Sequence, residues 1–498
     1  MSLYIVAILL YMRMLDLPAS RGYVSAMKKP GRNSQLRDTF RISTREGIFA
    51  QIFVSLAGAG SVFITKLAVM LGATPAHFGI LSAIGQFAQV LQPLGVAITR
   101  KRRFRKPVIL SMAATARSMA PLLGLIPLLF PHSAALPLVL AVYAAYSAIL
   151  AVCTNMWMGW IADMVPRGMR GRFFAQRNQM LMIAGVLASF LFGAAVDLFS
   201  TERGWLAGKI GDVLGIRQDP SALPLAFLAV FTLAGIIGLA GLPVLKRQPE
   251  KPKETEPEPF TEMLAGPFRD RNFRNLSIFG IWWMLAVGIG APFWQPFMIQ
   301  RLHMDVVQIL VYGTVSTIGA QLAIRPWGRF IDRHGNKPAM RLALMLGTVN
   351  PLLWLLLTPE NYWFIFLEAV LSGVMWSCAG IVTANMVLSI APEKYRQMYS
   401  GVFNALSSCA MMVTMLASGF FIPGGTVLLG RYLYPEQVLF LVTAFARLSA
   451  EIPLSWVHEP ESTPMGVLVR RFNSHAKVAI TGAVLIMARG RRRPRRGP

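Results

Sequence analysis

The sequence predicts an all-α polytopic membrane protein, and three observations support this fold class. Apolar residues make up 54% of the chain and charged residues only 14%, whereas soluble proteins contain roughly 25% charged residues. Apolar runs of about 20 residues, the length needed to cross about 30 Å of hydrocarbon, recur from Ile48 to Val457. The ten-residue alternating segments of a transmembrane barrel are absent from the sequence.

The chain carries a formal net charge of +26, which raises the alternative of nucleic-acid binding. Its basic residues, however, lie between the apolar runs and in the two tails, so they form no continuous face on a foldable soluble domain. We therefore expect no nucleic-acid partner. The three cysteines (Cys153, Cys378 and Cys409) fall inside apolar runs without metal-ligand spacing, so we expect neither a metal site nor a cofactor.

Residues 1–45 are expected to form a cytoplasmic N-terminal tail. Arg37, Arg41 and Arg45 recur in this tail at helical spacing. The resulting basic face would lie on anionic lipid headgroups.

Twelve candidate membrane spans follow the tail. A proline- and charge-rich linker, residues 246–275, divides them six and six. The predicted units are an N-terminal six-helix bundle (46–245), the linker, a C-terminal six-helix bundle (276–458) and a basic cytoplasmic tail (459–498). The expected spans lie near residues 47–71, 75–99, 107–130, 134–161, 178–199, 222–245, 276–300, 305–327, 338–358, 361–390, 397–422 and 434–457.

The distribution of basic residues predicts the orientation of the chain. Of the 49 Lys and Arg residues, 41 lie in the two tails and in the loops that follow even-numbered spans. Cytoplasmic loops carry an excess of such residues. We therefore expect a multi-pass protein of the bacterial inner membrane with both termini in the cytoplasm.

The two halves of the chain resemble one another. Lys106-Pro107 matches Lys337-Pro338 at an offset of about 231, and Met164-Val165-Pro166 matches Ile390-Ala391-Pro392 at an offset of about 226. Matches in the same order at a nearly constant offset indicate a duplication, with parallel halves related by an axis along the membrane normal.

Residues 328–337 (GRFIDRHGNK) bring charge and glycine between two apolar runs. Ionised groups in hydrocarbon cost several kcal/mol, so we expect this stretch to form a short hairpin loop at a membrane surface. The stretch resembles the loop signature of the major facilitator superfamily. The signature positions are filled by Gly328, Asp332, Gly335 and Lys337, with Arg333 among them.

The resemblance covers residues 45–458 and implies two six-helix bundles around a central cavity that opens alternately to either side. It also implies that contacts of Asp332 latch the bundles together on the cytoplasmic side. The alternative is a loop whose arginines only set the orientation.

The first-half copy of this loop signature is degraded, since Lys101 stands where the acid is expected. The loop after the fourth span instead carries Asp163, Arg170 and Arg172. It resembles a loop of a poorly characterised bacterial branch of the superfamily. We expect these residues to replace the degraded signature, or otherwise to act only in orientation.

Ionisable residues within spans are functional candidates by default. Glu368 and Lys66 are expected roughly 8–11 Å inside the periplasmic edge, facing each other or sharing a charged ligand in the cavity. Glu368 is also a candidate proton carrier. For Lys66 the alternative is a side chain that reaches the membrane surface. Arg117, near the midplane, is an anion-binding candidate or a partner of backbone carbonyls and neighbouring polar groups.

We expect Arg447 and Glu451, four residues apart, to form an intrahelical ion pair. Further candidates for substrate binding are uncharged residues in the spans expected to line the cavity. Hydrogen bonding and stacking suit these residues to hold a ligand, although helix packing is the alternative. They are Gln51, Asn155, Trp376 and Asn385.

No phosphate-binding loop and no nucleophile–base arrangement occurs in the sequence, so we expect no enzyme. The sequence predicts a secondary active transporter that moves a small, charged or zwitterionic organic solute by alternating access. It would be coupled to protons or another ion, or would act as a facilitator. The alternative is a membrane assembly or lipid-handling protein that does not transport. The expected partners are the solute, protons and anionic lipids, and the chain is expected to be a monomer.

Overall fold

The computed structural model describes residues 32–99, 102–166, 169–200, 204–215, 219–252, 266–428, 430–460, 462–464 and 466–467. Three predictions fall wholly or partly outside these residues. They concern the first part of the N-terminal tail, the linker between residues 253 and 265, and the basic C-terminal tail after residue 467.

Almost every described segment of the first half is helical. In chain order its elements are α3 (Arg32–Ala57), α4 (Val62–Met70), α5 (Pro75–Val90), α6 (Leu94–Thr99), α7 (Lys106–Ser118), α8 (Ala120–Leu129), α9 (His132–Met164), α10 (Arg170–Asp197), α11 (Trp205–Leu214), η3 (Pro220–Ala222), α12 (Leu223–Ala240) and α13 (Leu242–Lys246).

The second half repeats this pattern and adds one short hairpin, β1–β2, with Val427 opposite Tyr432 in antiparallel register. Its elements are α15 (Arg271–Gly290), η4 (Ala291–Phe293), α16 (Trp294–Gln300), α17 (Val306–His334), α18 (Asn336–Trp354), η5 (Tyr362–Phe364), α19 (Ile365–Ile390), η6 (Glu393–Tyr395), α20 (Arg396–Phe420), β1 (Thr426–Leu428), β2 (Arg431–Leu433), α21 (Pro435–Ser449) and α22 (Glu451–Trp456).

Ten helical segments of the described chain are long and apolar enough to cross a membrane. The predicted all-α polytopic membrane protein is therefore confirmed. The two expected spans that are not among these ten are helical as well. One is α5 followed by α6, interrupted near Pro93, and the other is α18. The total of twelve spans stays a prediction.

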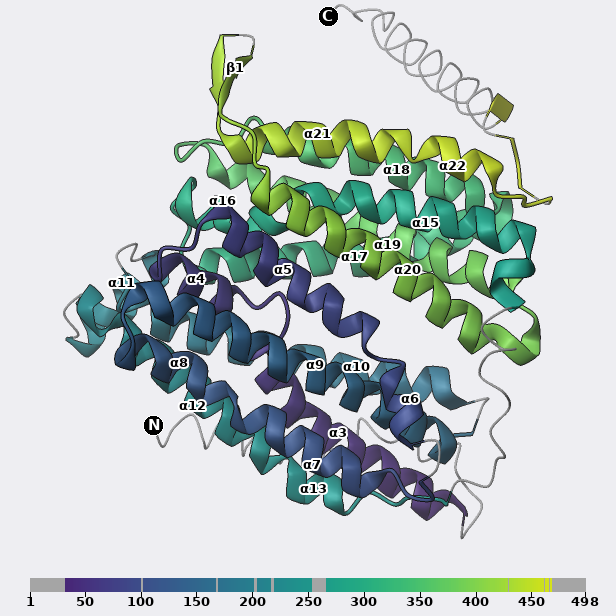
Figure 1. The fold of residues 1–498 in the computed structure, drawn as a ribbon, viewed down its shortest axis with the longest axis horizontal. Helices are drawn as coiled ribbons and strands as arrows, with labels where there is room; N and C mark the ends of the chain where they lie inside the picture. The colour runs from purple at the N-terminus through teal and green to yellow at the C-terminus, as the bar shows by residue number, and fades with distance from the viewer. Residues whose placement is uncertain are drawn as a thin grey trace, which may run out of the picture.

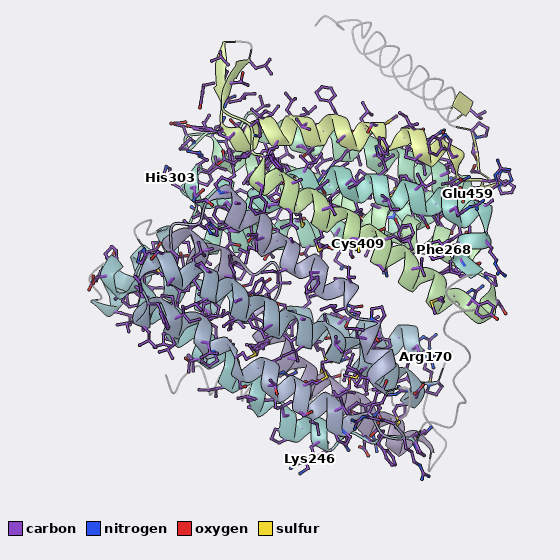
Figure 2. All side chains as sticks on the ribbon, viewed as in Figure 1. Arg170, Lys246, Phe268, His303, Cys409 and Glu459 are labelled. Atoms are coloured by element: carbon purple, nitrogen blue, oxygen red, sulfur yellow. The ribbon has the colours of Figure 1, made fainter. Side chains whose placement is uncertain are left out.

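The helices form two bundles that lie side by side (Figure 1). In the first, α3 packs against α10 and α12; in the second, α19 packs against α17 and α18. We call the end of the molecule that carries α11 and the β1–β2 hairpin the hairpin end. The opposite end, which carries α13 and α22, is the linker end. His303 lies at the hairpin end, whereas Arg170 and Glu459 lie at the linker end (Figure 2).

The two bundles contact each other mainly through α5 with α20 and α10 with α17. Glycines permit the first of these contacts. A Cβ atom added to Gly79 of α5 would lie 2.9 Å from the Cα atom of Gly419 in α20. Real Cβ atoms do not approach other atoms so closely, so a larger residue at Gly79 would push the two helices apart.

The first helix begins earlier than expected. α3 runs without a break from Arg32 to Ala57, so residue 45 is no helix boundary, and Arg37, Arg41 and Arg45 extend the helix of the first span. Thr39, Ser43 and Glu46 are buried in this stretch, which shows that it packs against the bundle.

The expectation that residues 328–337 form a hairpin loop is wrong. α17 continues to His334, and only Gly335, with φ +92°, separates it from α18. The physical reason is length. The 29 residues of α17 rise about 44 Å at roughly 1.5 Å each, whereas the hydrocarbon core is about 30 Å thick. The last turns therefore reach beyond the hydrocarbon and carry their charges as a helix.

A buried ion pair holds the first bundle together. The Nη2 atom of Arg117 lies 2.8 Å from Oε1 of Glu46, and both side chains are nearly inaccessible. Arg117 also donates a hydrogen bond of 2.7 Å to the backbone oxygen of Gly238. These contacts join α7 to α3 and α12, and they favour the structural alternative for Arg117 over anion binding.

We expect Glu46→Gln to destabilise the protein by about 3–5 kcal/mol, because removing one partner leaves the other charge buried and uncompensated. Thermal unfolding in detergent measures the loss. Glu360→Gln is the matched control, since Glu360 is fully exposed and its replacement should leave the unfolding temperature unchanged. Equal unfolding temperatures for the two variants would contradict the assignment.

Candidate functional site

A cavity of about 560 Å³ lies between the two bundles. Helices α4, α5 and α9 of the first bundle line it, together with α16, α17, α18, α19, α20 and α21 of the second. Its polar lining residues are Ser61, Thr65, Ser82, Gln86, Gln89, Tyr143, Gln295, Tyr312, Asn350, Glu368, Ser372 and Arg447. The volume is in the range of sites that hold small molecules.

Glu368 is the acidic residue of this cavity. It lies in the first turn of α19 with 2% of its surface exposed. Its Oε1 atom accepts a hydrogen bond from the Asn350 side chain, whereas its Oε2 atom has no hydrogen-bond partner. The side chains of Tyr312 and Trp354 lie beside the carboxyl group. The structure thus places this predicted residue in a polar pocket with one acceptor atom unused.

Arg447 of α21 is the basic residue of the cavity, and sequence reasoning gave it another role. It does not pair with Glu451, whose carboxylate lies 2.5 Å from Arg341. The reason is a break in the helix at Ala450, which separates α21 from α22 and turns Glu451 away. The expected intrahelical ion pair is therefore wrong.

The Arg447 guanidinium group is held by a backbone oxygen and two indole rings. Nη1 donates a 3.1 Å hydrogen bond to the backbone oxygen of Gly347. The Cζ atom lies 5.8 Å from the ring centre of Trp283 and 6.0 Å from that of Trp376, within the range of cation–π attraction. The Nε atom has no hydrogen-bond partner.

Aromatic side chains form much of the wall around these two charges. Trp354 packs in a cluster with Trp294 and Phe440, in which the rings of Trp294 and Phe440 stack at 3.9 Å. Trp376 keeps 38% of its surface exposed, so its ring is available to a ligand. The prediction that Trp376 lines the cavity agrees with this arrangement.

Lys66 does not line the cavity opposite Glu368. It is buried in α4 and lies close enough to Asp197 and Asp305 to interact electrostatically with both. Sequence reasoning missed Asp197 because it lies far from Lys66 along the chain, at the end of another span.

Asp197 joins the two bundles at the hairpin end. This fully buried residue is the last of α10, and its carboxylate accepts hydrogen bonds from the backbone N–H groups of Val306 (3.0 Å) and Val307 (2.9 Å). Those groups open α17 in the other bundle. A carboxylate is favoured at a helix N-terminus by unpaired N–H groups and by the helix dipole.

Asp305 caps the same helix from within its own bundle, accepting a 2.6 Å hydrogen bond from the backbone N–H of Gln308. Burial raises the pKa of the Asp305 carboxyl group, while the bond from Gln308 and the nearby Lys66 act in the opposite direction.

A second set of hydrogen bonds joins the two bundles at the hairpin end. Thr65 of α4 donates a 2.6 Å hydrogen bond to the Gln295 side-chain oxygen in α16, and the Gln295 amide donates to the backbone oxygen of Gly60 at 3.0 Å. Thr65 and Gln295 both line the cavity. The hydrogen bonds between the bundles described here therefore cluster at the hairpin end.

Three predicted binding residues lie elsewhere. Gln51 bonds to Ser55 of its own helix at 3.3 Å and packs against α10. Asn155 packs against Gly95 of α6, and Asn385 donates a 3.2 Å hydrogen bond to Asn336 at the linker end. None of the three lines the cavity, which agrees with the packing alternative.

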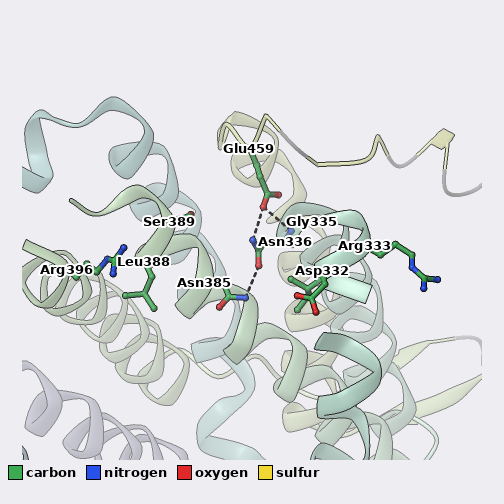
Figure 3. Close-up of a pocket in the computed structure, with 10 residues that line it drawn as sticks. Asp332, Arg333, Gly335, Asn336, Asn385, Leu388, Ser389, Arg396 and Glu459 are labelled. Carbon is green, nitrogen blue, oxygen red and sulfur yellow. Dashed lines mark hydrogen bonds between the residues drawn. The ribbon is translucent and has the colours of Figure 1, made fainter. Parts of the chain in front are cut away.

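Asp332 and Arg333 lie beside a second pocket, of about 480 Å³, at the linker end (Figure 3). Gly335 and Asn385 also line it. Arg396, at the start of α20, lies on the far side of the pocket from Asp332 (Figure 3). The two opposite charges therefore face the same space without touching.

Glu459, rather than Asp332, caps the N-terminus of α18. Its carboxylate accepts hydrogen bonds from the backbone N–H groups of Asn336 (3.0 Å) and Lys337 (2.7 Å). Lys337 in turn donates from Nζ to the backbone oxygens of Ser455 and Val457. The segment after α22 is thus anchored to the loop signature (Figure 3).

An equivalent helix cap occurs in the first bundle. Glu250, just after α13, accepts hydrogen bonds from the backbone N–H groups of Arg105 (2.5 Å) and Lys106 (3.2 Å) at the start of α7. Lys106 and Lys337 are the residues that the sequence comparison of the two halves matched. Glu250 and Glu459 therefore cap equivalent helices in the two bundles.

The three candidate residues of the loop after α9 lie in different surroundings. Asp163 pairs with Arg105 at 3.0 Å, not with Arg170 or Arg172. Arg170 donates hydrogen bonds to the backbone oxygens of Ala162 (2.5 Å) and Val165 (3.0 Å) and so caps the end of α9. Arg172 is exposed.

Comparison with known proteins identifies the class. A sequence model of the Major Facilitator Superfamily matches residues 47–324 and 284–467. The chain therefore belongs to the major facilitator superfamily, a family of membrane transporters, and the predictions of family membership and of a transporter rather than an enzyme are confirmed.

Among curated proteins, a putative sugar efflux transporter of Deinococcus radiodurans is 24% identical over 192 residues, which is 36% of this chain and 44% of that protein. The chain thus matches less than half the length of this relative.

Solved structures show the same fold at low identity. The nucleoside transporter NupG superposes with a TM-score of 0.59 at 14% identity, over 85% of this chain and 98% of its own. A D-xylose–proton symporter superposes with a TM-score of 0.61 at 12% identity, over 85% and 98%.

We expect Glu459→Ala to cost about 0.5–2 kcal/mol, because the first N–H groups of α18 lose their cap. Hydrogen exchange should rise at the amides of Asn336 and Lys337. Glu393→Ala is the control, since Glu393 is exposed and pairs with Arg396 of its own turn. Unchanged protection at Asn336 and Lys337 would show that Glu459 is no cap in solution.

Proposed function

We propose that this secondary transporter moves a small polar organic solute across the bacterial inner membrane by alternating access, as a monomer. The observation that carries the proposal is the polar cavity between the bundles, which holds the buried Glu368. A lipid-handling or assembly protein would favour a plugged, apolar centre between the bundles. The polar lining therefore favours transport.

The excess of basic residues in the loops of the linker end supports a cytoplasmic position for that end and for both termini. In this orientation the contacts of Asp197 and Gln295 close the periplasmic side. Asp332 and Arg396 stand apart on the cytoplasmic side, at the two edges of one pocket. Both residues belong to the second bundle, so in the opposite state it is a contact of Asp332 with the first bundle that would latch the cytoplasmic side.

The relatives support a polar organic solute. The curated relative is named as a sugar efflux transporter, and the two structural neighbours as transporters of nucleosides and of D-xylose with protons. Proteoliposomes loaded with a labelled metabolite pool test the proposal directly. Uptake or release that requires the protein supports transport, and its absence across a broad pool favours the assembly or lipid-handling alternative.

We propose that Glu368 also carries the proton that drives accumulation, since it is a buried acid beside the solute space. Glu368→Gln, a mimic of the protonated acid, should still exchange solute across a vesicle but should lose pH-driven accumulation. Counterflow and pH-jump uptake in proteoliposomes measure the two activities. The exposed Glu360→Gln serves as the control, and full pH-driven uptake by Glu368→Gln would remove Glu368 from this role.

Asp197 should hold the periplasmic side closed. Hydrogen bonds to a charged group contribute about 1.5–3 kcal/mol each, and 1.4 kcal/mol corresponds to a factor of about ten in an equilibrium constant. Asp197→Ala should therefore open that side at least roughly tenfold more often.

The readout is the rate at which an impermeant maleimide labels Ser82→Cys, a cavity residue, from the periplasmic side, after replacement of the three native cysteines. Asp212→Ala, an exposed carboxylate in α11, is the control. Equal labelling rates in the two variants would show that Asp197 does not hold this side closed.

A further inference from the structure

Two charged side chains of the central cavity remain unpaired with each other. Glu368 and Arg447 each expose 2% of their surface and both line the cavity. Among the described residues, neither takes part in an ion pair within 4.0 Å. Oε2 of Glu368 and Nε of Arg447 each lack a hydrogen-bond partner. Buried polar atoms without partners are costly, so a ligand that satisfies both atoms would be stabilised.

The positions of both groups are fixed by other contacts. Asn350 holds the other oxygen of Glu368. Gly347 holds Nη1 of Arg447, and the rings of Trp283 and Trp376 flank its guanidinium group. One acceptor atom and one donor atom thus stay unpaired at fixed places beside the cavity, although neither atom is exposed in this conformation. A ligand that reaches them meets groups that are already largely ordered.

The cavity lining also has a defined charge balance. Glu368 and Arg447 are its two charged residues, and the other lining residues are uncharged. Lys66, which sequence reasoning placed opposite Glu368, lies outside the lining. With Glu368 ionised, the two charges cancel. An anion or a cation would therefore bring an uncompensated charge into a buried space, which is strongly unfavourable.

We propose that the cavity recognises a solute of zero net charge that bridges Glu368 and Arg447. The solute donates a hydrogen bond to Oε2 of Glu368, accepts one from Nε of Arg447 and lays an apolar or ring face against Trp376. Arg447 is thereby a binding residue of this transporter. The inference rests on the proposed transport function and narrows its small polar organic solute to a net-neutral class. Neutral hydroxylated rings and zwitterions share this chemistry.

A matched series of ligands tests the charge rule. Phenylalanine is a zwitterion, 2-phenylethanol is neutral, 3-phenylpropionate is an anion and phenethylamine is a cation, all on one ring scaffold. D-xylose and uridine add neutral hydroxylated rings. Binding to the purified full-length protein is followed by tryptophan fluorescence and thermal shift. We expect the best net-neutral ligand to bind at least roughly tenfold tighter than the anion and the cation, because only these two bring an unpaired charge.

Two single variants shift the preference in opposite directions. Glu368→Gln leaves the cavity with a positive charge and should improve binding of 3-phenylpropionate. Arg447→Gln leaves it negative and should improve binding of phenethylamine. The double variant keeps zero net charge, so it should still disfavour both ions while binding the net-neutral ligands more weakly. It keeps the test decisive if a single variant does not fold. Glu360→Gln should bind like the unaltered protein.

The proposal is overturned if an ion binds as tightly as the net-neutral ligands, if no net-neutral ligand binds, or if the variants leave the charge preference unchanged. Transport is scored separately in proteoliposomes. A protein that moves only charged solutes keeps the transport function and refutes the net-neutral class. A protein that binds net-neutral solutes by this rule but moves none of them supports the net-neutral class and refutes the transport function.

Discussion

The cost of placing charge inside an apolar helix bundle governs the arrangement of this protein. Each buried ionic group described above has found a specific compensation. Arg117 meets Glu46 inside the first bundle, and Asp197 meets the N-terminus of a helix in the second. In the central cavity, Glu368 and Arg447 each keep one buried atom without a hydrogen-bond partner, and so does Arg117 in the first bundle. Glu368 and Arg447 differ from the scaffold charges in their position, because both line the cavity between the bundles.

The carboxylate of Asp197 is in an unusual electrostatic position. It ends α10, where the negative end of the helix dipole disfavours an acid. It also contacts the N-terminus of α17, where the positive end of the dipole favours one. Its stability at this place therefore depends on the contact between the bundles. Lys66 adds a compensating charge from α4. The hairpin end is thus held closed by a carboxylate that would lose its hydrogen-bond donors if the two bundles separated there.

Much of the fold and part of the site follow from the sequence. Apolar runs predicted the helices because their length is set by the membrane, and Glu368 was found because an acid inside a span is expensive. Arg447 was assigned to Glu451 because four-residue spacing implies one continuous helix, and the break at Ala450 is not visible in composition. The partners of Lys66 could not be predicted, since they come from distant helices whose approach is a property of tertiary packing.

The paired carboxylates Glu250 and Glu459 have a consequence for how the molecule is assembled. Each follows the last span of its half and caps the helix of the third span of the same half, which is α7 for Glu250 and α18 for Glu459. Each half therefore supplies this cap from its own sequence. If the polypeptide were divided between residues 252 and 266, the hydrogen bonds of both caps would stay within one piece each. Each piece would then carry the acid that caps its own helix, and the contacts of α5 with α20 and of α10 with α17 would be left to join the two pieces.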